Sequence, residues 1–228
     1  MIEAFENILL WLIIGVLATL IGIYHREIIS VIINILRSSR LETRKCGIIG
    51  IYENRHTLKA RKAIKKAIKK ADGVISLIGV AFPDFFRPGS DIMEIIGKKL
   101  EDPTFTLRIL LLNPHNEYAK ERAGREKGDF TIKDIEQSIM FLEEVSTRAR
   151  IIVHTYNIPP IVYAIITDKC VFAEQYLYAL PKTDLACMGG QVPFLECKKD
   201  SDFNKVVKQH FEYMWHNKSE EIINRGGT

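Results

Sequence analysis

An uncharged apolar stretch near the N-terminus constrains this chain more than any other feature. Residues 7–24 read NILLWLIIGVLATLIGIY, and their polar positions include Asn7, Thr19 and Tyr24. As a helix this segment is about 27 Å long at roughly 1.5 Å per residue, close to the hydrocarbon thickness of a bilayer, about 30 Å. A helix buried in a protein core rarely runs this far without a polar face. The stretch therefore predicts a membrane-spanning helix.

The residues on either side of this stretch exclude a signal peptide and give an orientation. Glu3 and Glu6 precede it where a signal peptide would have basic residues, and His25-Arg26-Glu27 follows it in place of a cleavage site. Basic residues follow the span within about twenty positions but do not precede it. The positive-inside rule therefore predicts a single-pass protein of the inner or cell membrane, with its C-terminal domain in the cytoplasm.

The sequence predicts two parts, a transmembrane helix with a stalk over residues 1–40 and a cytoplasmic domain over residues 41–228. Residues 25–40 continue at helical spacing and are interpreted as a stalk helix, while an interfacial helix and a helix–helix contact in an oligomer remain as alternatives. The four cysteines form no C-x-x-C pair, which is typical of reduced cytosolic thiols. We expect neither a metal nor a cofactor.

Charge is distributed unevenly along the chain. Residues 37–70 contain twelve Lys or Arg and two acids, so the rest of the chain carries a net −6 within a total of +4. Most of this charge lies in residues 56–72, a predicted helix with a thin apolar stripe. Its basic face is either solvated or attracted to anionic lipid headgroups, and the residues expected at a membrane surface are Lys59, Lys62, Lys66 and Lys70. No aromatic residues interleave with these lysines, so nucleic acid is not expected as a partner.

Beyond this helix the pattern alternates between short apolar runs and amphipathic segments. Strands are predicted at residues 46–52, 73–81, 107–112, 150–154, 163–167 and 171–175, the last two joined by a turn at Asp168-Lys169. Helices are predicted at residues 90–100, 116–126, 131–149 and 200–217, with Ser90 and Thr131 as N-terminal caps and Asp200 opening the last. Residues 179–193 read as a loop. Such alternation predicts one α/β domain with a mixed or parallel sheet covered on both faces.

Common catalytic motifs are missing from the sequence. It contains no phosphate-binding G-x-x-x-x-G-K-[ST], no G-x-G-x-x-G, no G-x-S-x-G and no H-E-x-x-H. The six histidines are dispersed, and His154 is the one at the end of a predicted strand. A histidine in that place is either catalytic or structural.

The succession of GVISLIGVAFPDFF, TLRILLLNPHNEYAKERAGREKG, RIIVHTYNIPPIVYAIITDKCVFAEQY and DFNKVVKQHFEYMW resembles one lobe of the phospholipase D superfamily. It is most similar to a prokaryotic branch that carries such a lobe without the usual catalytic motif. The resemblance covers about residues 46–217. It implies a mixed sheet flanked by helices, a pocket for phosphodiesters at the strand ends, and pairing with a second copy into a homodimer or larger assembly.

In catalytic members the signature is H-x-K-x-x-x-x-D, in which the His attacks phosphorus and the Lys neutralises the phosphoryl oxygens. Aligned on the turn, Asp168 matches the Asp, but Ile161 takes the place of the His and Tyr163 that of the Lys. Ile161 has no nucleophilic atom. The resemblance therefore implies a degenerate lobe that binds without cleaving.

Eight residues are candidates for binding a ligand in such a pocket. Arg122 is the preferred anion contact, because its planar fork suits phosphate. Tyr163 would stack on a base, although aromatic residues in strands more often belong to the core. The other candidates also have a purely structural interpretation, each as a strand end, a turn residue or a core residue. They are Asn113, His154, Asp168, Glu174, Gln175 and Tyr176.

We therefore expect a membrane-anchored pseudoenzyme that senses a phosphate-containing ligand, such as a nucleotide signal, in a bacterial or archaeal signalling or antiviral system. The first alternative is a membrane-bound phosphodiesterase or nuclease that uses His154 in an altered site. The second is a scaffold that binds anionic lipid through the basic helix.

Overall fold

The computed structural model describes residues 46–125, 130–146, 150–176 and 192–224. The predicted membrane span, the stalk and residues 41–45 lie outside these ranges. Among the helices that are described, none is long and apolar enough to cross a bilayer. Residues Cys46–Thr228 form one compact unit, separate from Met1–Lys45.

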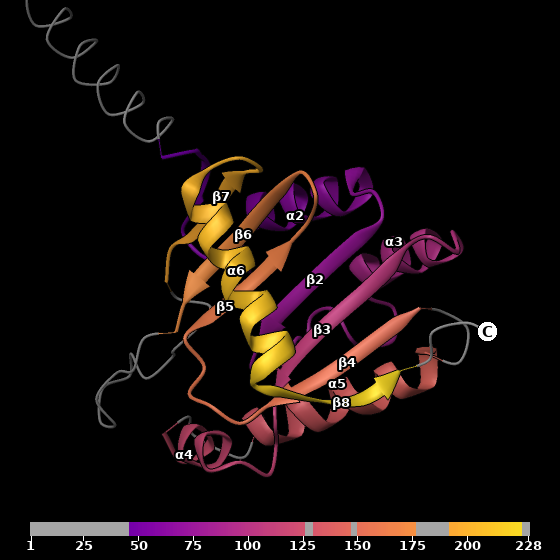
Figure 1. Ribbon diagram of the computed structural model, residues 1–228, viewed down its shortest axis with the longest axis vertical. Helices are drawn as coiled ribbons and strands as arrows, with labels where there is room; N and C mark the ends of the chain where they lie inside the picture. The colour runs from indigo at the N-terminus through magenta and orange to yellow at the C-terminus, as the bar shows by residue number, and fades with distance from the viewer. Residues whose placement is uncertain (1–45, 126–129, 147–149, 177–191, 225–228) are drawn as a thin grey trace, which may run out of the picture. The chain divides into compact units, whose positions relative to one another are not determined.

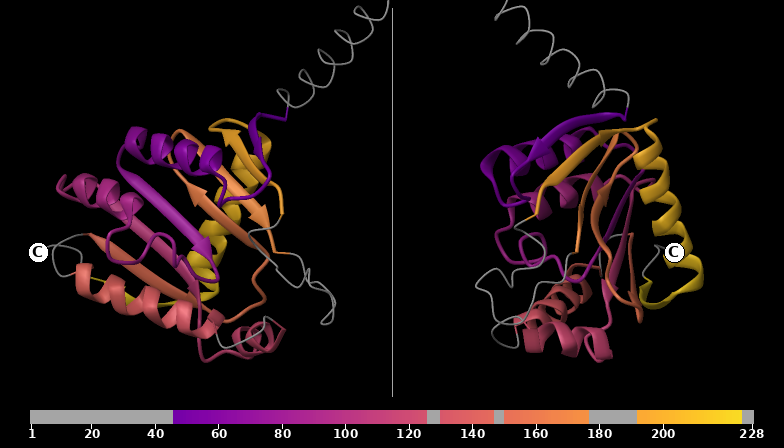
Figure 2. Two further views of the ribbon diagram at one scale, coloured as in Figure 1. Left: turned by 180° about the vertical axis from the view of Figure 1, so that it is seen from behind. Right: turned by 90° about the vertical axis from the view of Figure 1, so that its left-hand side faces the viewer.

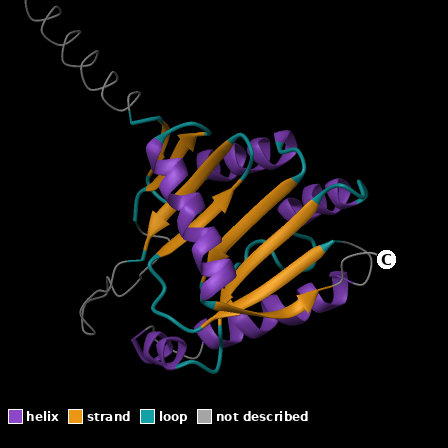
Figure 3. Ribbon diagram, in the orientation of Figure 1, coloured by secondary structure: helices purple, strands orange, loops and turns teal. Residues whose placement is uncertain are grey.

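The unit contains strands and helices that alternate through its first two thirds (Figures 1 and 3). The strands are β1 (Ile48–Tyr52), β2 (Val74–Gly79), β3 (Thr106–Leu112), β4 (Ile151–Tyr156), β5 (Val162–Ile166), β6 (Cys170–Gln175), β7 (Phe194–Lys198) and β8 (Ser219–Asn224). The helices are α2 (Leu58–Lys70), α3 (Asp91–Leu100), α4 (Glu117–Arg125), α5 (Phe130–Ser146) and α6 (Asp202–Asn217).

All eight strands belong to one sheet, in the order β1-β7-β6-β5-β2-β3-β4-β8. Neighbours β2, β3 and β4 run parallel, and the other neighbouring pairs are antiparallel. The expected α/β class with a mixed sheet flanked by helices is confirmed, as is the antiparallel pairing of β5 with β6.

Helices cover both faces of the sheet. Figure 2 shows α6 on one face and α2, α3 and α5 on the other, with α4 packed against α5. The central strands are buried on both faces, as parallel strands between helix layers must be, and their runs of branched apolar residues follow from that position. The core also takes in large aromatic side chains, among them Phe82, Tyr156, Phe172 and Phe211.

Side chains at the helix starts confirm one predicted cap and correct two. Ser90 caps α3, because its hydroxyl accepts a hydrogen bond from the Met93 N–H at 3.3 Å. Ser201, and not Asp200, caps α6 in the same way. The predicted cap at Thr131 is wrong, because Phe130 is already helical and Thr131 is buried in the first turn of α5.

Two strands were missed by the sequence prediction. β7 (FLECK) and β8 (SEEIIN) mix charged with apolar residues, and β8 immediately follows α6, so neither shows a long apolar run. Both join the sheet next to strands far away in sequence, β7 between β1 and β6 and β8 beside β4. Most of the predicted loop at residues 179–193 lies outside the described residues.

Candidate functional site

The sheet presents one edge at which several strands end together. The parallel strands β2, β3 and β4 have their carboxyl ends there, and the registers of β5 and β6 bring the start of β5 and the end of β6 to the same edge. Ligand sites of open α/β sheets lie at the carboxyl ends of strands. This edge is therefore the candidate location of a functional site.

The end of β2 packs tightly against tyrosines at this edge. The Val80 N–H donates to the Tyr176 hydroxyl at 2.9 Å, and the Tyr156 hydroxyl donates to the Gly79 carbonyl at 3.1 Å. A Cβ atom at Gly79 would lie 3.1 Å from both Tyr163 and the Tyr176 hydroxyl and 3.2 Å from Phe82. A side chain at this position would therefore require the neighbouring rings to shift by a few tenths of an ångström.

A buried carboxylate lies beside these tyrosines. Tyr163 on β5 and Glu174 on β6 are direct cross-strand partners, and both residues are about 3% exposed. One guanidinium nitrogen of Arg55 donates to the Glu174 Oε1 atom, forming an ion pair, and the same guanidinium stands 4.5 Å from the centre of the Tyr163 ring. Arg55 thus bridges the loop after β1 to the strand pair β5–β6.

The segment that carries Arg55 is fixed by local hydrogen bonds. The Asn54 side chain accepts from the His56 N–H at 2.9 Å, and the Thr57 hydroxyl donates to the Asn54 carbonyl at 3.1 Å. Thr57 also caps α2 by accepting from the Ala60 N–H at 3.3 Å. Hydrogen bonds of Asn54 and Thr57, the residues on either side, therefore hold Arg55 and His56 in a short turn.

The second oxygen of Glu174 distinguishes this cluster from an ordinary ion pair. Oε2 is buried and has no hydrogen-bond partner among the described residues. Burial raises the pKa of Glu174 above its ordinary value, and Arg55, His56 and Arg122 act in the opposite direction without cancelling it. A buried acceptor without a donor is costly, so Oε2 is a position where a ligand's N–H or O–H group would be favourable.

A second arginine approaches from α4. Arg122 is 7% exposed, and its guanidinium lies 4.7 Å from the centre of the Tyr176 ring. Arg55 and Arg122 both lower the pKa of Tyr176 against the larger, opposing effect of burial. The cluster therefore holds two guanidinium groups, each over a tyrosine ring, and the carboxylate of Glu174, which is ion-paired with Arg55. We call the set Arg55, Arg122, Tyr163, Glu174 and Tyr176 the arginine–tyrosine cluster.

A histidine–aspartate pair adjoins this cluster. His56 follows Arg55 directly, and its Nδ1 atom lies 3.0 Å from the Asp84 Oδ2 atom in the loop between β2 and α3. The hydrogen bond from His56 holds the pKa of Asp84 below its ordinary range despite partial burial. Ser90 secures the loop by donating to the Asp84 carbonyl at 3.1 Å. Unlike the arginine–tyrosine cluster, this pair is open to solvent.

Of the eight residues predicted to bind a ligand, the structure brings Arg122, Tyr163, Glu174 and Tyr176 together. Asn113 is at the same edge, but its side chain closes a turn by accepting from the His115 N–H at 2.9 Å. Gln175 is exposed because it is the last residue of β6, whose preceding residues are buried on both faces, and its side chain points to the opposite face from Glu174.

His154 and Asp168 lie away from the cluster. The His154 ring stacks on Trp215 of α6 at 3.8 Å, with Nδ1 2.9 Å from the Ser219 hydroxyl and Nε2 3.5 Å from a Glu221 oxygen. Burial lowers the pKa of His154. Asp168 lies at the opposite end of β5, where it accepts from the Asp72 N–H at 2.9 Å and pairs with Lys169.

The sequence prediction missed Arg55, His56 and Asp84. Asp84 follows the carboxyl end of a predicted buried strand, a position that could have marked it as a candidate. Arg55 and His56 carried no comparable signal, because their relation to Glu174 crosses 119 and 118 residues of sequence. The predicted surface lysines of α2, Lys59, Lys62, Lys66 and Lys70, are all exposed.

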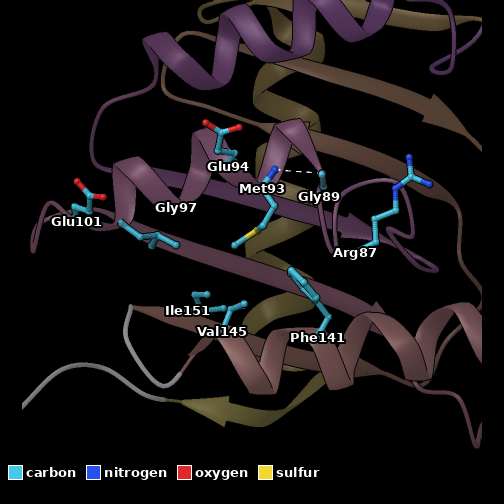
Figure 4. A pocket seen from close by; sticks show the side chains of 11 residues that line it. Arg87, Gly89, Met93, Glu94, Gly97, Glu101, Phe141, Val145 and Ile151 are labelled. Atoms are coloured by element: carbon cyan, nitrogen blue, oxygen red, sulfur yellow. Dashed lines mark hydrogen bonds between the residues drawn. The ribbon is translucent and has the colours of Figure 1, made fainter.

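A separate groove of about 510 Å³ lies between α3 and α5. Figure 4 shows Met93 and Phe141 projecting into it, with Glu94 and Glu101 directed away. Its interior is apolar, and none of the predicted site residues lines it.

Across the described residues, no group of three or more His, Cys, Asp or Glu side chains is placed to hold a metal ion.

Neither known protein families nor curated proteins match this chain in sequence. Solved structures with a similar fold include three named proteins. They are phosphatidylserine synthase of Haemophilus influenzae Rd KW20 (10% identity, TM-score 0.49), the archaeal chromatin protein TrmBL2 (12%, 0.43) and NucT of Helicobacter pylori (15%, 0.44). They cover 76%, 90% and 74% of this chain, respectively.

The matched region makes up 39% of the synthase, 69% of TrmBL2 and 96% of NucT, so this chain spans about two fifths of the synthase's length. The synthase and NucT have phospholipase D-like folds, the fold that the sequence resembles. At these scores the similarity assigns neither a family nor an activity, and the function has to follow from the geometry of the site.

Proposed function

We propose that this protein is a membrane-anchored, degenerate phospholipase D-like lobe that binds a small phosphate-bearing ligand, such as a nucleotide, in the arginine–tyrosine cluster. The observation that carries the proposal is the buried Glu174 Oε2 atom, which has no donor among the residues that the structure describes, although two guanidinium groups influence the same carboxylate. The cluster therefore offers cationic donors and a buried acceptor together.

The chemistry of the cluster selects the ligand class. A guanidinium has five N–H donors, and among the described residues Arg55 uses one of them, for Glu174. Arg55 and Arg122 bring two guanidinium groups to the cluster, and the planar fork of a guanidinium suits a phosphate group. Glu174 Oε2 would accept from a hydroxyl or amino group of the same ligand. A nucleotide carries both kinds of group, whereas inorganic phosphate carries no base and no sugar.

Thermal denaturation of the full chain in detergent micelles tests this proposal. A panel of linear and cyclic nucleotides is added, with inorganic phosphate alongside. A ligand at about 100 times its Kd stabilises the native state by about 2.7 kcal/mol, which raises the Tm by about 5–10 °C for a unit of this size. The shift should shrink in Glu174→Gln and Arg122→Lys. It should persist in Gln175→Ala, a matched control, because Gln175 is next to Glu174 in sequence but is exposed and points to the opposite face of the sheet. No shift with any nucleotide would refute the proposal.

In the same proposal the chain acts as a homodimer or larger assembly, and ligand binding changes the packing of the anchor helices predicted at residues 7–24. The resemblance to single-lobe members of the phospholipase D superfamily, which pair with a second copy, supports the proposed assembly. Light scattering of the full chain in detergent, with and without the stabilising nucleotide, should give a mass of at least two chains. A mass of one chain under both conditions would refute the proposed assembly.

A second candidate function is phosphodiester hydrolysis, and the pair His56–Asp84 favours it. Asp84 engages the Nδ1 atom of His56, which leaves Nε2 as the nucleophilic or basic nitrogen. Arg55, the preceding residue, would neutralise phosphoryl oxygens. His154, the histidine expected for this role, is stacked under α6 instead.

Hydrolysis of bis(p-nitrophenyl) phosphate distinguishes the two candidates. If the protein is an enzyme, turnover should be lost in His56→Ala and retained in His154→Ala. Binding without turnover in the wild type supports the sensor and removes the hydrolase.

A further inference from the structure

The basic residues of α2 are sorted by position around the helix. At about 100° per residue, the buried side chains Ala60, Ile64, Ala67 and Ile68 occupy one side. An arc of about 120° on the opposite side holds six residues, all exposed: Leu58, Lys59, Lys62, Lys66, Lys69 and Lys70. We call this set the lysine arc.

The cations next to the arc form ion pairs with described residues, but those within it do not. Lys65 and Arg61 both pair with Asp91 at the start of α3. The five lysines of the arc form no ion pair with any residue that the structure describes. Several of them lie three or four positions apart, where like charges repel and destabilise the helix. Lys69 and Lys70 stand in the last turn of α2, where cations are favourable, but the other three lysines have no such compensation. This positive face, unpaired among the described residues, is suited to an external anionic partner.

The form of the arc distinguishes between anionic partners. No aromatic side chain stands in it, so it lacks the stacking surface on which single-stranded nucleic acid is bound. Leu58, at the end of the arc, is 77% exposed and offers an apolar contact to the acyl boundary of a bilayer. The sequence also places an uncharged stretch of eighteen residues, long enough to span a bilayer, upstream of α2.

We propose that the lysine arc of α2 lies against an anionic phospholipid surface. The five ammonium groups contact lipid headgroups, and Leu58 inserts at the interface. Because each lysine near such a surface strengthens binding about fivefold, the arc as a whole provides a strong but salt-sensitive attachment. This inference does not depend on the ligand proposed for the arginine–tyrosine cluster.

Amine labelling of the full chain on vesicles tests the proposal. Residues 7–24 could hold the chain on any vesicle, so the accessibility of individual lysines is the readout. The protein is bound to vesicles of phosphatidylcholine, with or without phosphatidylglycerol, and acetylation is quantified at each lysine by mass spectrometry. Labelling of the arc should slow severalfold on the anionic vesicles only and recover in high salt. The exposed residues Lys120, Lys133 and Lys199 serve as internal controls and should label equally on both.

A charge-reversed variant completes the test. Combined Lys59→Glu, Lys62→Glu, Lys66→Glu and Lys70→Glu should abolish the anion-dependent protection of Lys69 without changing the far-ultraviolet circular dichroism spectrum. Reversal of the control lysines should leave that protection intact. Equal labelling of the arc on both kinds of vesicle would overturn the proposal. So would protection by RNA or polyphosphate without protection by anionic vesicles.

Discussion

Removing Arg55 should destabilise the protein through the carboxylate that it leaves behind. In Arg55→Ala, Glu174 keeps a fully buried side chain and loses its ion-pair partner. Breaking a buried ion pair by deleting one partner costs about 3–5 kcal/mol. Since the Arg55 side chain is 20% exposed, water moderates the loss, and we expect about 3 kcal/mol. For a domain of this size that corresponds to a Tm lower by about 6–12 °C.

A double-mutant cycle separates the ion pair from other contacts of Arg55. In Glu174→Gln no buried charge remains, so Arg55→Ala should then cost about 1 kcal/mol, the value of losing its contact with the Tyr163 ring. The coupling energy between the two positions should therefore be about 2 kcal/mol. Urea denaturation of the four proteins at neutral pH measures it.

The pH provides an independent check on this reasoning. The cost of Arg55→Ala should shrink as the pH falls through the raised pKa of Glu174, because a protonated carboxyl needs no cation. A coupling energy below about 0.5 kcal/mol, the limit of additivity, would refute the assignment of the stability loss to the buried charge.

Three further results are expected. Gly79→Ala should cost about 1–3 kcal/mol in urea denaturation, because the added Cβ crowds two tyrosines; an unchanged midpoint would contradict this. Glu174 binds its proton more tightly in the native than in the unfolded state, so its contribution to stability is present below its ordinary pKa of 4.5 and is lost as the pH rises through the raised value. Wild-type stability should accordingly fall relative to Glu174→Gln across that window, and parallel pH profiles would speak against it. His154→Ala should lose about 1 kcal/mol of stacking on Trp215 yet bind nucleotide as the wild type does; weakened binding would place His154 in the site after all.

The elements that sequence reasoning located correctly are those whose pattern is local. The apolar runs of β2 and β3 and the amphipathic spacing of α2 are set by burial on two faces or on one, so they are visible in a short window. The strands β7 and β8 mix charged with apolar residues, and pairing with β1 and β4, which are distant in sequence, defines them; no local pattern reveals such pairing.

The candidate site could be predicted only in part, because some of its residues are brought together by contacts between distant parts of the sequence. Tyr163, Glu174 and Tyr176 lie within fourteen residues of one another, and a hairpin brings them to one edge. Arg55 joins them through tertiary structure alone. His154 shows the opposite case: the sequence predicts it at a strand end, a common place for catalytic groups, but β4 continues to Tyr156 and Trp215 of α6 stacks on the His154 ring.

The central claim is that the arginine–tyrosine cluster receives a phosphate-bearing ligand, and a binding isotherm tests it most directly. The nucleotide that stabilises the full chain most is titrated calorimetrically into the wild type, Arg122→Gln and Gln175→Ala. We predict that Arg122→Gln binds at least about tenfold more weakly, since a charge-assisted hydrogen bond contributes about 1.5–3 kcal/mol, while Gln175→Ala matches the wild type. Equal affinity of the wild type and Arg122→Gln would contradict the claim.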